Sequence, residues 1–280
     1  MNYSEFILTK KTFASSKGTI KYIDKGHGTV LLLLHGVPTS SWLYRKMVDE
    51  LSQNHRVIVP DMLGFGSSDS PKGYEIYEPK EHAKRILELM DFLKIDIWSH
   101  VFHDAGGLWT WELLKLSSKR IENLIILNSV IYEEGFKPPI RFKKGFLAKF
   151  VMKLYSYSLT NGILLNGLFN QSLVKNNLSK DDLMGYKTPL LEGKTEAMYH
   201  FFSNTCNDLP NYQEVIKSLS MPKLLIWGKH DKFLVIDEMM EKVKLDMSLE
   251  DSNINIIEAK HYIQEEKPVK INELILGFLS

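Results

Sequence analysis

The sequence predicts an α/β fold, in which helices flank a mostly parallel sheet. Two observations lead to this prediction. Short apolar runs alternate with longer stretches of helical spacing, as expected when parallel strands, buried on both faces, are joined by helices. The alternation stops between residues 135 and 221, where helical spacing continues without a strand. We therefore expect one core sheet interrupted by one helical insertion.

The elements follow in order along the chain. The expected strands are Val30–Leu34, Val57–Val59, Ile95–Val101, Leu124–Leu127, Leu224–Trp227 and Ile254–Ile257. The expected helices of the core are Ser41–Gln53, Tyr77–Lys94, Gly106–Ser118 and a last one from Val269. Helical patches in the insertion are Phe146–Tyr155, Ile163–Asn170, Ser179–Met184 and Thr195–Asn204. Turn residues at 135–139 and 221–222 bound it. We expect residues 1–134 and 222–280 to form the core domain, and residues 135–221 to form a helical lid after the sixth strand.

The amino-acid composition limits the classes of binding partner that we expect. The 35 basic and 34 acidic residues nearly cancel, which leaves a formal net charge of +1. Nucleic acids and anionic membranes usually require a strongly basic face, so neither is an expected partner. The single cysteine, Cys206, cannot form an internal disulfide. No signal peptide is visible at the N-terminus. We expect a cytoplasmic monomer or homodimer that uses no cofactor or metal.

The turn Phe102-His103-Asp104-Ala105-Gly106 carries the first candidate catalytic residue. A buried strand ends here and a glycine-opened helix begins, which is the local pattern of a nucleophile elbow. Asp104 occupies the nucleophile position. Taken alone, an aspartate before glycines is equally typical of a helix N-cap, so the assignment depends on its partners.

Those partners follow other strands. Asp231 comes just after the strand Leu224–Trp227, and His261 comes just after Ile254–Ile257. Ligands bind at the carboxyl ends of parallel strands, and the chain order nucleophile, acid, histidine is that of the α/β-hydrolase motif. The backbone N–H groups of Val37 and Ala105 are expected to form an oxyanion hole. Glu133 and Glu134, after the sixth strand, are alternative acids. His103 and His230 are interpreted as structural.

These motifs resemble the α/β-hydrolase superfamily, and within it the branch of epoxide hydrolases and haloalkane dehalogenases. The resemblance extends from about Thr12 to the C-terminus and is closest at His35–Ser41, Asp61–Asp69 and His261–Glu266. It implies an α/β-hydrolase fold with a helical lid. It also implies that an ionised Asp104 attacks an sp³ carbon to form a covalent ester, which water activated by His261 then hydrolyses. Asp231 orients His261.

The leaving group separates the two enzyme classes. The resembling dehalogenases bind halide with a tryptophan after the nucleophile, where this chain has Ala105, and no tryptophan lies in the insertion. The resembling epoxide hydrolases use two lid tyrosines, for which Tyr199 is the first candidate. Tyr155, Tyr157 and Tyr186 are candidates for the second position and for substrate binding, although tyrosines at helical spacing are more often packing residues.

The expected function is therefore an epoxide hydrolase-like reaction on a small apolar or amphipathic molecule. The elbow residue Phe102 and the His35–Ser41 loop resemble dehalogenases more closely, so a haloalkane dehalogenase-like hydrolase is the first alternative. A β-lactone-opening enzyme uses the same nucleophile. A catalytically silent small-molecule binder is the alternative outside enzymes.

Overall fold

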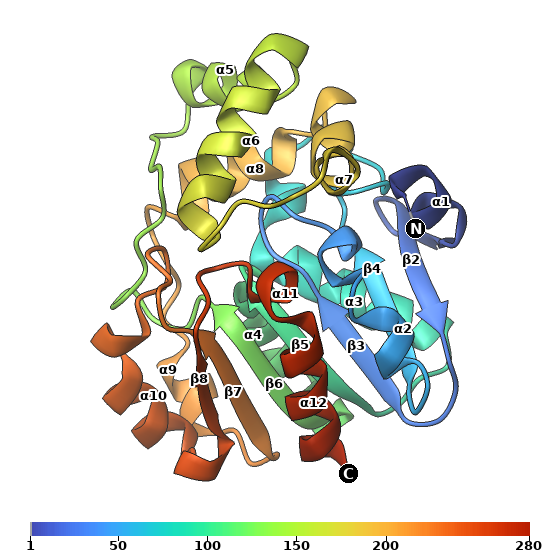
Figure 1. Cartoon of the computed structure of the whole chain (residues 1–280), viewed down its shortest axis with the longest axis vertical. Helices are drawn as coiled ribbons and strands as arrows, with labels where there is room; N and C mark the ends of the chain where they lie inside the picture. The colour runs from blue at the N-terminus through green and yellow to red at the C-terminus, as the bar shows by residue number, and fades with distance from the viewer. Residues whose placement is uncertain (1) are drawn as a thin grey trace.

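A computed structural model, which describes residues 2–280, contains one eight-stranded sheet (Figure 1). Its spatial order is β1-β2-β4-β3-β5-β6-β7-β8, and β2 alone runs antiparallel to its neighbours within the described residues. The strands are β1 (Lys11–Ser15), β2 (Gly18–Lys25), β3 (Val30–Leu34), β4 (Arg56–Asp61), β5 (Trp98–Asp104), β6 (Ile121–Ser129), β7 (Lys223–Gly228) and β8 (Ile254–Ile257). The predicted mostly parallel sheet is confirmed.

Helices cover both faces of the sheet. The α-helices are α1 (Tyr3–Leu8), α2 (Val48–Leu51), α3 (Pro79–Phe92), α4 (Gly106–Ser117), α5 (Phe146–Leu154), α6 (Ser158–Ser172), α7 (Lys180–Leu191), α8 (Glu196–His200), α9 (Gln213–Lys217), α10 (Met240–Met247), α11 (Ile263–Glu266) and α12 (Pro268–Leu279). Helices α2 and α12 pack together on one face, while α3 and α4 pack together on the other (Figure 1).

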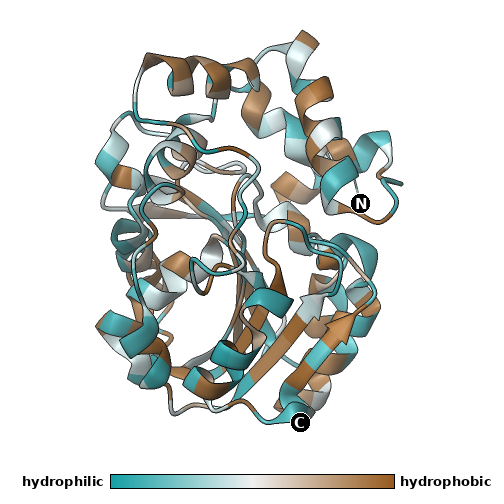
Figure 2. Ribbon diagram, turned by 90° about the vertical axis from the view of Figure 1, so that its left-hand side faces the viewer, coloured by the Kyte–Doolittle hydropathy of each residue, from teal (hydrophilic) through white to brown (hydrophobic). Residues whose placement is uncertain are grey.

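Short helical turns complete the chain. They are the 3₁₀ turns η1 (Ser41–Tyr44), η2 (Tyr74–Tyr77), η3 (Ser118–Arg120), η5 (Ile236–Glu238) and η6 (Asp251–Asn253), and the π-helical turn η4 (Phe201–Thr205). The central strands β3, β5 and β6 are almost wholly buried, and Figure 2 colours strands of this sheet largely as hydrophobic. Burial on both faces explains why β3 is a continuous apolar run and why β6 contains another, Leu124–Leu127, rather than an alternating pattern.

Three local predictions were wrong. The helix expected at Ser41–Gln53 is broken into η1 and α2, and Ser40 caps η1 by accepting a hydrogen bond from the Trp42 N–H. The strand expected at Ile95–Val101 instead runs from Trp98 to Asp104. The hairpin of β1 and β2 was not predicted as strands, because its exposed and buried positions mix polar and apolar side chains.

Four of the inserted helices, α5 to α8, lie above the carboxyl edge of the sheet, whereas α9 packs against α4 and α10. Helices α5 to α9 all follow β6 and precede β7, and Figure 1 draws α5, α6, α7 and α8 above the strand tips. Between Gly135 and Pro222 the described chain contains no strand, only an isolated bridge from Phe136 to Leu234. The division at residues 135 and 221 into core and lid stays a prediction. Across residues 2–280, each helix is too short or too polar to cross a bilayer.

Candidate active site

Asp104 stands at the tip of β5 in a strained backbone conformation. Its φ is +52°, a left-handed value that is rare for a residue with a side chain. The strand must turn sharply here to enter α4 at Gly106. The turn is crowded: a Cβ on Gly36 would overlap the Asp104 carboxylate, so only glycine fits at that position. The sequence forms the elbow that its glycines predicted.

The two carboxylate oxygens of Asp104 have different neighbours. Its Oδ2 accepts a hydrogen bond of 2.8 Å from the Val37 backbone N–H, and the Ala105 N–H also bonds to this carboxylate. Its Oδ1 lies 3.6 Å from Nε2 of His261. The Val37 N–H therefore holds one carboxylate oxygen, and the other oxygen faces the histidine.

His261 is held by the predicted acid. Its Nδ1 lies 2.8 Å from Oδ2 of Asp231, which fixes the ring so that Nε2 faces Asp104. Oδ1 of Asp231 accepts hydrogen bonds from the backbone N–H groups of Phe233 (2.8 Å) and Leu234 (3.1 Å). All three predicted residues are buried. The structure thus brings Asp104, His261 and Asp231 together in one chain of polar contacts.

Burial and charge act in opposite directions on this triad. Burial raises the pKa of Asp104, against the lowering effects of His261 and of the two N–H donors. For His261, burial opposes the charged form, but the charge and hydrogen bond of Asp231, together with the charge of Asp104, raise its pKa overall. A protonated His261 and an ionised Asp104 stabilise each other.

Asn128 is a site residue that the sequence reasoning missed. It ends β6 with a φ of +29°, its Nδ2 donates to Oδ2 of Asp231 at 2.7 Å, and its Oδ1 accepts from the Gly228 N–H at 2.8 Å. The rule that located the triad, a polar residue at a strand end, also applies to Asn128. The alternative acids Glu133 and Glu134 instead point to solvent and pair with Arg141 and Lys242.

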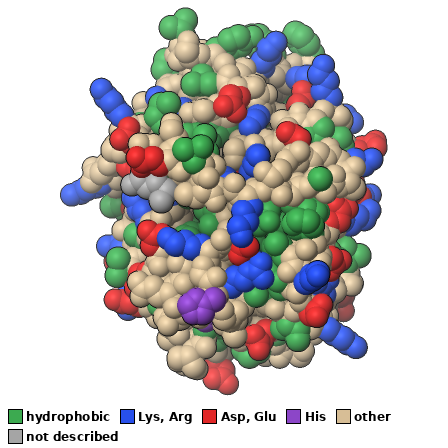
Figure 3. All heavy atoms as spheres, turned by 90° about the vertical axis from the view of Figure 1, so that its right-hand side faces the viewer, with side chains coloured by type: hydrophobic (Ala, Val, Ile, Leu, Met, Phe, Trp, Pro, Cys, Tyr) green, Lys and Arg blue, Asp and Glu red, His purple; other side chains and the backbone are tan. Residues whose placement is uncertain are grey.

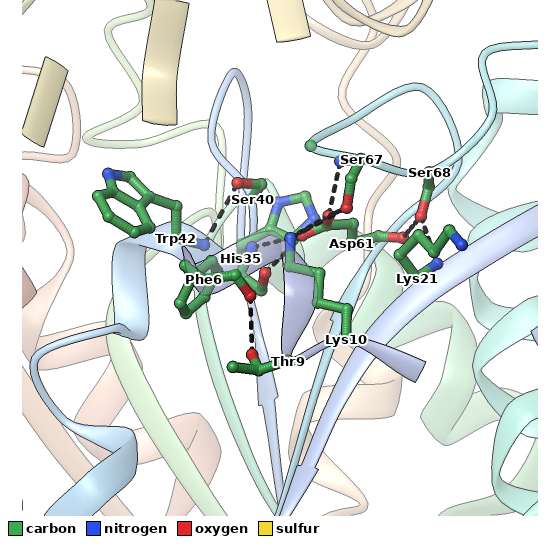
Figure 4. A network of polar contacts seen from close by, with 12 residues as sticks. Phe6, Thr9, Lys10, Lys21, His35, Ser40, Trp42, Asp61, Ser67 and Ser68 are labelled. Carbon is green, nitrogen blue, oxygen red and sulfur yellow. Dashed lines mark hydrogen bonds and ion pairs between the residues drawn. The ribbon is translucent and has the colours of Figure 1, made fainter. Parts of the chain in front are cut away.

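The loop that carries Val37 is tied to a buried ion pair (Figure 4). Lys10 Nζ lies 2.6 Å from Oδ2 of Asp61, and both side chains are almost completely excluded from solvent. Asp61 also accepts hydrogen bonds from the backbone N–H and hydroxyl groups of Ser41 and Ser67. Burial alone raises the pKa of Asp61, but Lys10 and these donors lower it to about 2. Three chain segments are thereby fixed beside the site.

His35 connects this network to the oxyanion loop. Its Nε2 accepts a hydrogen bond of 3.1 Å from the Met62 N–H, and its Nδ1 donates to the Gly36 carbonyl at 2.7 Å. Burial lowers the pKa of His35 to about 4, which keeps the ring neutral and able to accept from Met62. The ring therefore holds the backbone directly before Val37.

A cavity of about 300 Å³ lies over Asp104 and His261. Its walls are mainly apolar side chains from three segments: Pro138, Pro139 and Ile140; Leu164 and Leu168 of α6; and Met198, Phe201 and Phe202. Of the described residues 2–280, no tryptophan contributes to the lining. An apolar cavity with a few convergent polar groups is typical of a small-molecule site.

Two tyrosines line the cavity together with Asp104. Tyr155, a predicted substrate-binding residue, contributes from the end of α5, and Tyr262 follows His261. Burial raises the pKa of both, and the charge of Asp104 raises that of Tyr262 further. Neither hydroxyl has a hydrogen-bond partner within residues 2–280. Both phenols are thus available to a bound molecule. The sequence did not predict a role for Tyr262, because a tyrosine is more often a packing residue than a catalytic one.

The other predicted tyrosines do not line the cavity. The Tyr199 ring packs against Tyr74 at a centroid distance of 5.3 Å, while its neighbour Met198 faces the cavity. Tyr157 is half exposed at the start of α6, and the Tyr186 hydroxyl donates to Glu265. The cavity lining does not include these three residues, because helical spacing does not show which face of a lid helix meets the site; their roles stay predictions.

The two remaining histidines behave differently from each other. His230 is exposed and pairs with Glu258 at 2.7 Å. His103 is buried, its Nε2 donates to the His261 carbonyl at 3.0 Å, and its ring centroid lies 4.7 Å from that of His261. Burial holds the pKa of His103 well below its usual value. The side chain of His103 is structural, as expected, and it supports the backbone of His261.

Comparisons with known proteins agree with this geometry. The chain is 25% identical to epoxide hydrolase 3 of Xenopus tropicalis, over 92% of this chain and 74% of that protein. It is 26% identical to haloalkane dehalogenase 2 of Mycobacterium tuberculosis, over 94% of this chain and 92% of that protein. The crystal structure of epoxide hydrolase VrEH1 from Vigna radiata superposes with a TM-score of 0.78 at 21% identity, covering 96% of this chain and 97% of that one.

Residues 29–268 match the family model described as alpha/beta hydrolase fold. This match spans β3 to the start of α12 and includes every member of the triad. The sheet, the elbow at Asp104 and the sequence comparisons agree, and the chain belongs to the α/β-hydrolase family.

Proposed function

We propose that this protein is a hydrolase that opens epoxides through a covalent ester on Asp104. The observation that carries the proposal is the pair of unpartnered phenols, Tyr155 and Tyr262, which line the same apolar cavity as Asp104. An epoxide oxygen requires O–H donors as its carbon–oxygen bond breaks. Halide departure requires N–H donors, and within residues 2–280 the cavity is lined without a tryptophan.

In the first step, Oδ1 of Asp104 attacks an epoxide carbon. The carbon–oxygen bond breaks, and the epoxide oxygen takes a proton from Tyr155 or Tyr262, which leaves a hydroxyalkyl ester and a tyrosinate. Oδ1 is the nucleophilic oxygen because Oδ2 is held by the Val37 N–H. Alkylation removes the negative charge of Asp104, which is one of the effects that raise the pKa of His261. The pKa of His261 therefore falls on alkylation, so that more of the histidine is neutral and able to take a proton from water.

In the second step, His261 takes a proton from water as the water attacks the ester carbon. Negative charge develops on Oδ2, which the Val37 N–H already holds, and the Ala105 N–H is the second expected donor. The intermediate collapses to release the diol oxygen, which takes its proton from His261. Asp104 is left as a carboxylic acid, and its proton restores the tyrosine. Asp231 stabilises the transient positive charge of His261.

The helices α5 to α8 act in this proposal as a lid that excludes water. Apolar side chains of α6, α8 and η4 line the cavity, so a small or medium apolar epoxide fits better than a polar one.

The His261→Gln variant tests the mechanism. It should form the ester but not hydrolyse it, so incubation with alkyl and aryl epoxides should add the mass of the epoxide to the peptide that contains Asp104. Asp104→Asn should give no adduct. His230→Gln is the matched control, because His230 is an exposed histidine paired only with Glu258, and it should turn over normally.

A product assay separates the chemistries. The parent protein is incubated with epoxides, haloalkanes and β-lactones, and diol, halide and carbon dioxide are measured. Diol release supports the proposal, whereas halide or carbon dioxide release without diol replaces it with a dehalogenase or a lactone-opening enzyme. Absence of any Asp104 adduct across the panel would indicate a binding protein instead.

A further inference from the structure

All the charged side chains of the segment 135–180 are basic. It contains no aspartate or glutamate, although the whole chain has 34 acidic residues. Its eight basic residues are Lys137, Arg141, Lys143, Lys144, Lys149, Lys153, Lys175 and Lys180. The net charge of +1 therefore conceals a strongly basic region, which includes α5, α6 and the chain before them.

Part of this charge is neutralised by acids from other segments. The paired cations are Lys137 with Glu238, Arg141 with Glu133, and Lys149 with Glu196. Lys144 lies over the Tyr74 ring at 3.8 Å. Lys143 and Lys153 are exposed and have no acidic partner among residues 2–280. At least two lysines beside α5 are thus free to contact a negatively charged partner.

The same helices expose large apolar side chains. On α5, Phe146 is 85% exposed, and its ring stacks on that of Phe150 one turn later. Leu147 is exposed beside them, and Leu159 and Ile163 form an exposed pair one turn apart on α6. Figure 2 colours the helices at the top of the molecule strongly hydrophobic. Figure 3 shows apolar and basic side chains side by side along that upper edge.

This exposed surface is continuous with the active-site cavity. Ile163 is 74% exposed and also lines the cavity. Gly167, one turn further along α6, lines it too, and a Cβ added there would meet no atom within 4 Å. The cavity over Asp104 therefore opens beside Ile163 and Gly167 of α6, a helix that Figure 1 draws just below α5.

We propose that the exposed apolar surface of α5 and α6 binds the surface of an anionic lipid bilayer. This docking face consists of Phe146, Leu147, Phe150, Leu159, Ile163 and the adjacent Lys143. Exposed aromatic and aliphatic side chains flanked by lysines are the composition of an interfacial helix, which lies in the headgroup region without spanning the membrane. A second copy of this chain is a poorer partner, because the same cations would face each other. The expectation of no membrane partner relied on net charge, which does not report local charge.

The position of the cavity mouth gives the docking face a function. Apolar molecules dissolved in the bilayer would enter at Ile163 without crossing water. Which molecules react depends on the reaction proposed for Asp104, whereas bilayer binding itself does not.

Sedimentation with vesicles tests the binding. The full chain is mixed with vesicles of pure phosphatidylcholine and with vesicles of equal parts phosphatidylcholine and phosphatidylglycerol. The protein should sediment with the mixed vesicles and not with the neutral ones, and added salt should release it. The double variant Lys143→Glu with Phe150→Ser should lower the partition coefficient at least about tenfold.

The matched control is Leu116→Ser with Lys119→Glu. These are also one exposed apolar residue and one exposed lysine, but they lie at the far end of α4, away from the cavity. The control should bind like the parent, and both variants should keep the parent's circular dichroism. Failure to sediment with the mixed vesicles, or equal weakening by both double variants, would overturn the proposal. So would a dimer in sedimentation velocity that only the Lys143→Glu, Phe150→Ser variant disrupts. Because none of these readouts measures turnover, failure here leaves the proposed reaction untouched.

Discussion

Replacing Lys10 with methionine removes the positive partner of Asp61 and keeps most of the side-chain volume. The substitution should destabilise the protein by about 3 kcal/mol, since removing one member of a buried ion pair costs about 3–5 kcal/mol. The lower end applies because Asp61 retains four hydrogen bonds from Ser41 and Ser67.

The pKa of Asp61 gives a second measure of the same environment. It falls from 3.8 to about 2 in the folded protein, and a shift of that size corresponds to about 2 kcal/mol. Because the folded pKa is the lower one, this stability is present above pH 3.8 and is lost as the pH falls toward 2. Without Lys10, burial dominates and the pKa of Asp61 should rise instead. Protonation then relieves the buried charge, so the stability difference between Lys10→Met and the parent should narrow in acid.

Urea unfolding at about pH 7 and about pH 3 measures both quantities. Lys17→Met is the control, because Lys17 is exposed in the turn between β1 and β2, and its effect should stay within about 0.5 kcal/mol. The double variant Lys10→Met with Asp61→Asn should lose less stability than the sum of the single variants. A loss below about 1 kcal/mol at neutral pH, or a loss that is the same at both pH values, would refute this reasoning.

Three further predictions concern the active site. Tyr155→Phe and Tyr262→Phe should each slow epoxide opening by about 10²-fold and leave hydrolysis of a preformed ester unchanged. Single-turnover kinetics measures the two steps separately. Equal slowing of both steps would contradict the roles proposed for the phenols. Gly36→Ala should abolish adduct formation, because its Cβ would displace the Asp104 carboxylate; intact-protein mass spectrometry with an epoxide checks this, and an unchanged adduct yield would count against the crowded elbow. Because burial raises the pKa of Asp104, kcat/KM should fall with decreasing pH through a value above 3.8, and a pH profile with its acid limb at or below 3.8 would exclude the predicted shift.

The candidate triad was predictable because its residues lie at or shortly after the ends of strands. Asp104 ends β5, while Asp231 and His261 follow the predicted strands Leu224–Trp227 and Ile254–Ile257 within a few residues, and parallel strands bring such positions to one edge of a sheet. The same reasoning from strand ends predicted that the backbone N–H groups of Val37 and Ala105 lie at this edge. It also applies to Asn128, which comes directly after the apolar run Leu124–Leu127.

The lid residues were not predictable in the same way. A strand has two faces, and burial of both fixes its position, but a lid helix can rotate to present several faces to a cavity. Tyr199 lies one residue from Met198, yet only Met198 lines the cavity. The place of Tyr262 in the cavity beside Asp104 and Tyr155 depends on three segments that are distant in sequence.

The Val37 N–H, donating to Oδ2 of Asp104 in the resting protein, has a consequence for selectivity and inhibition. The oxyanion donors are already occupied by the enzyme's own oxygen, so a carboxylic ester entering the cavity has no donor pair for its carbonyl oxygen. Reagents that inhibit serine esterases by placing a tetrahedral phosphorus or boron oxygen among such donors should bind poorly here. Alkylating agents that react with a carboxylate should inactivate the protein, and resistance to the first class with sensitivity to the second would distinguish it from esterases of the same fold in a mixed extract.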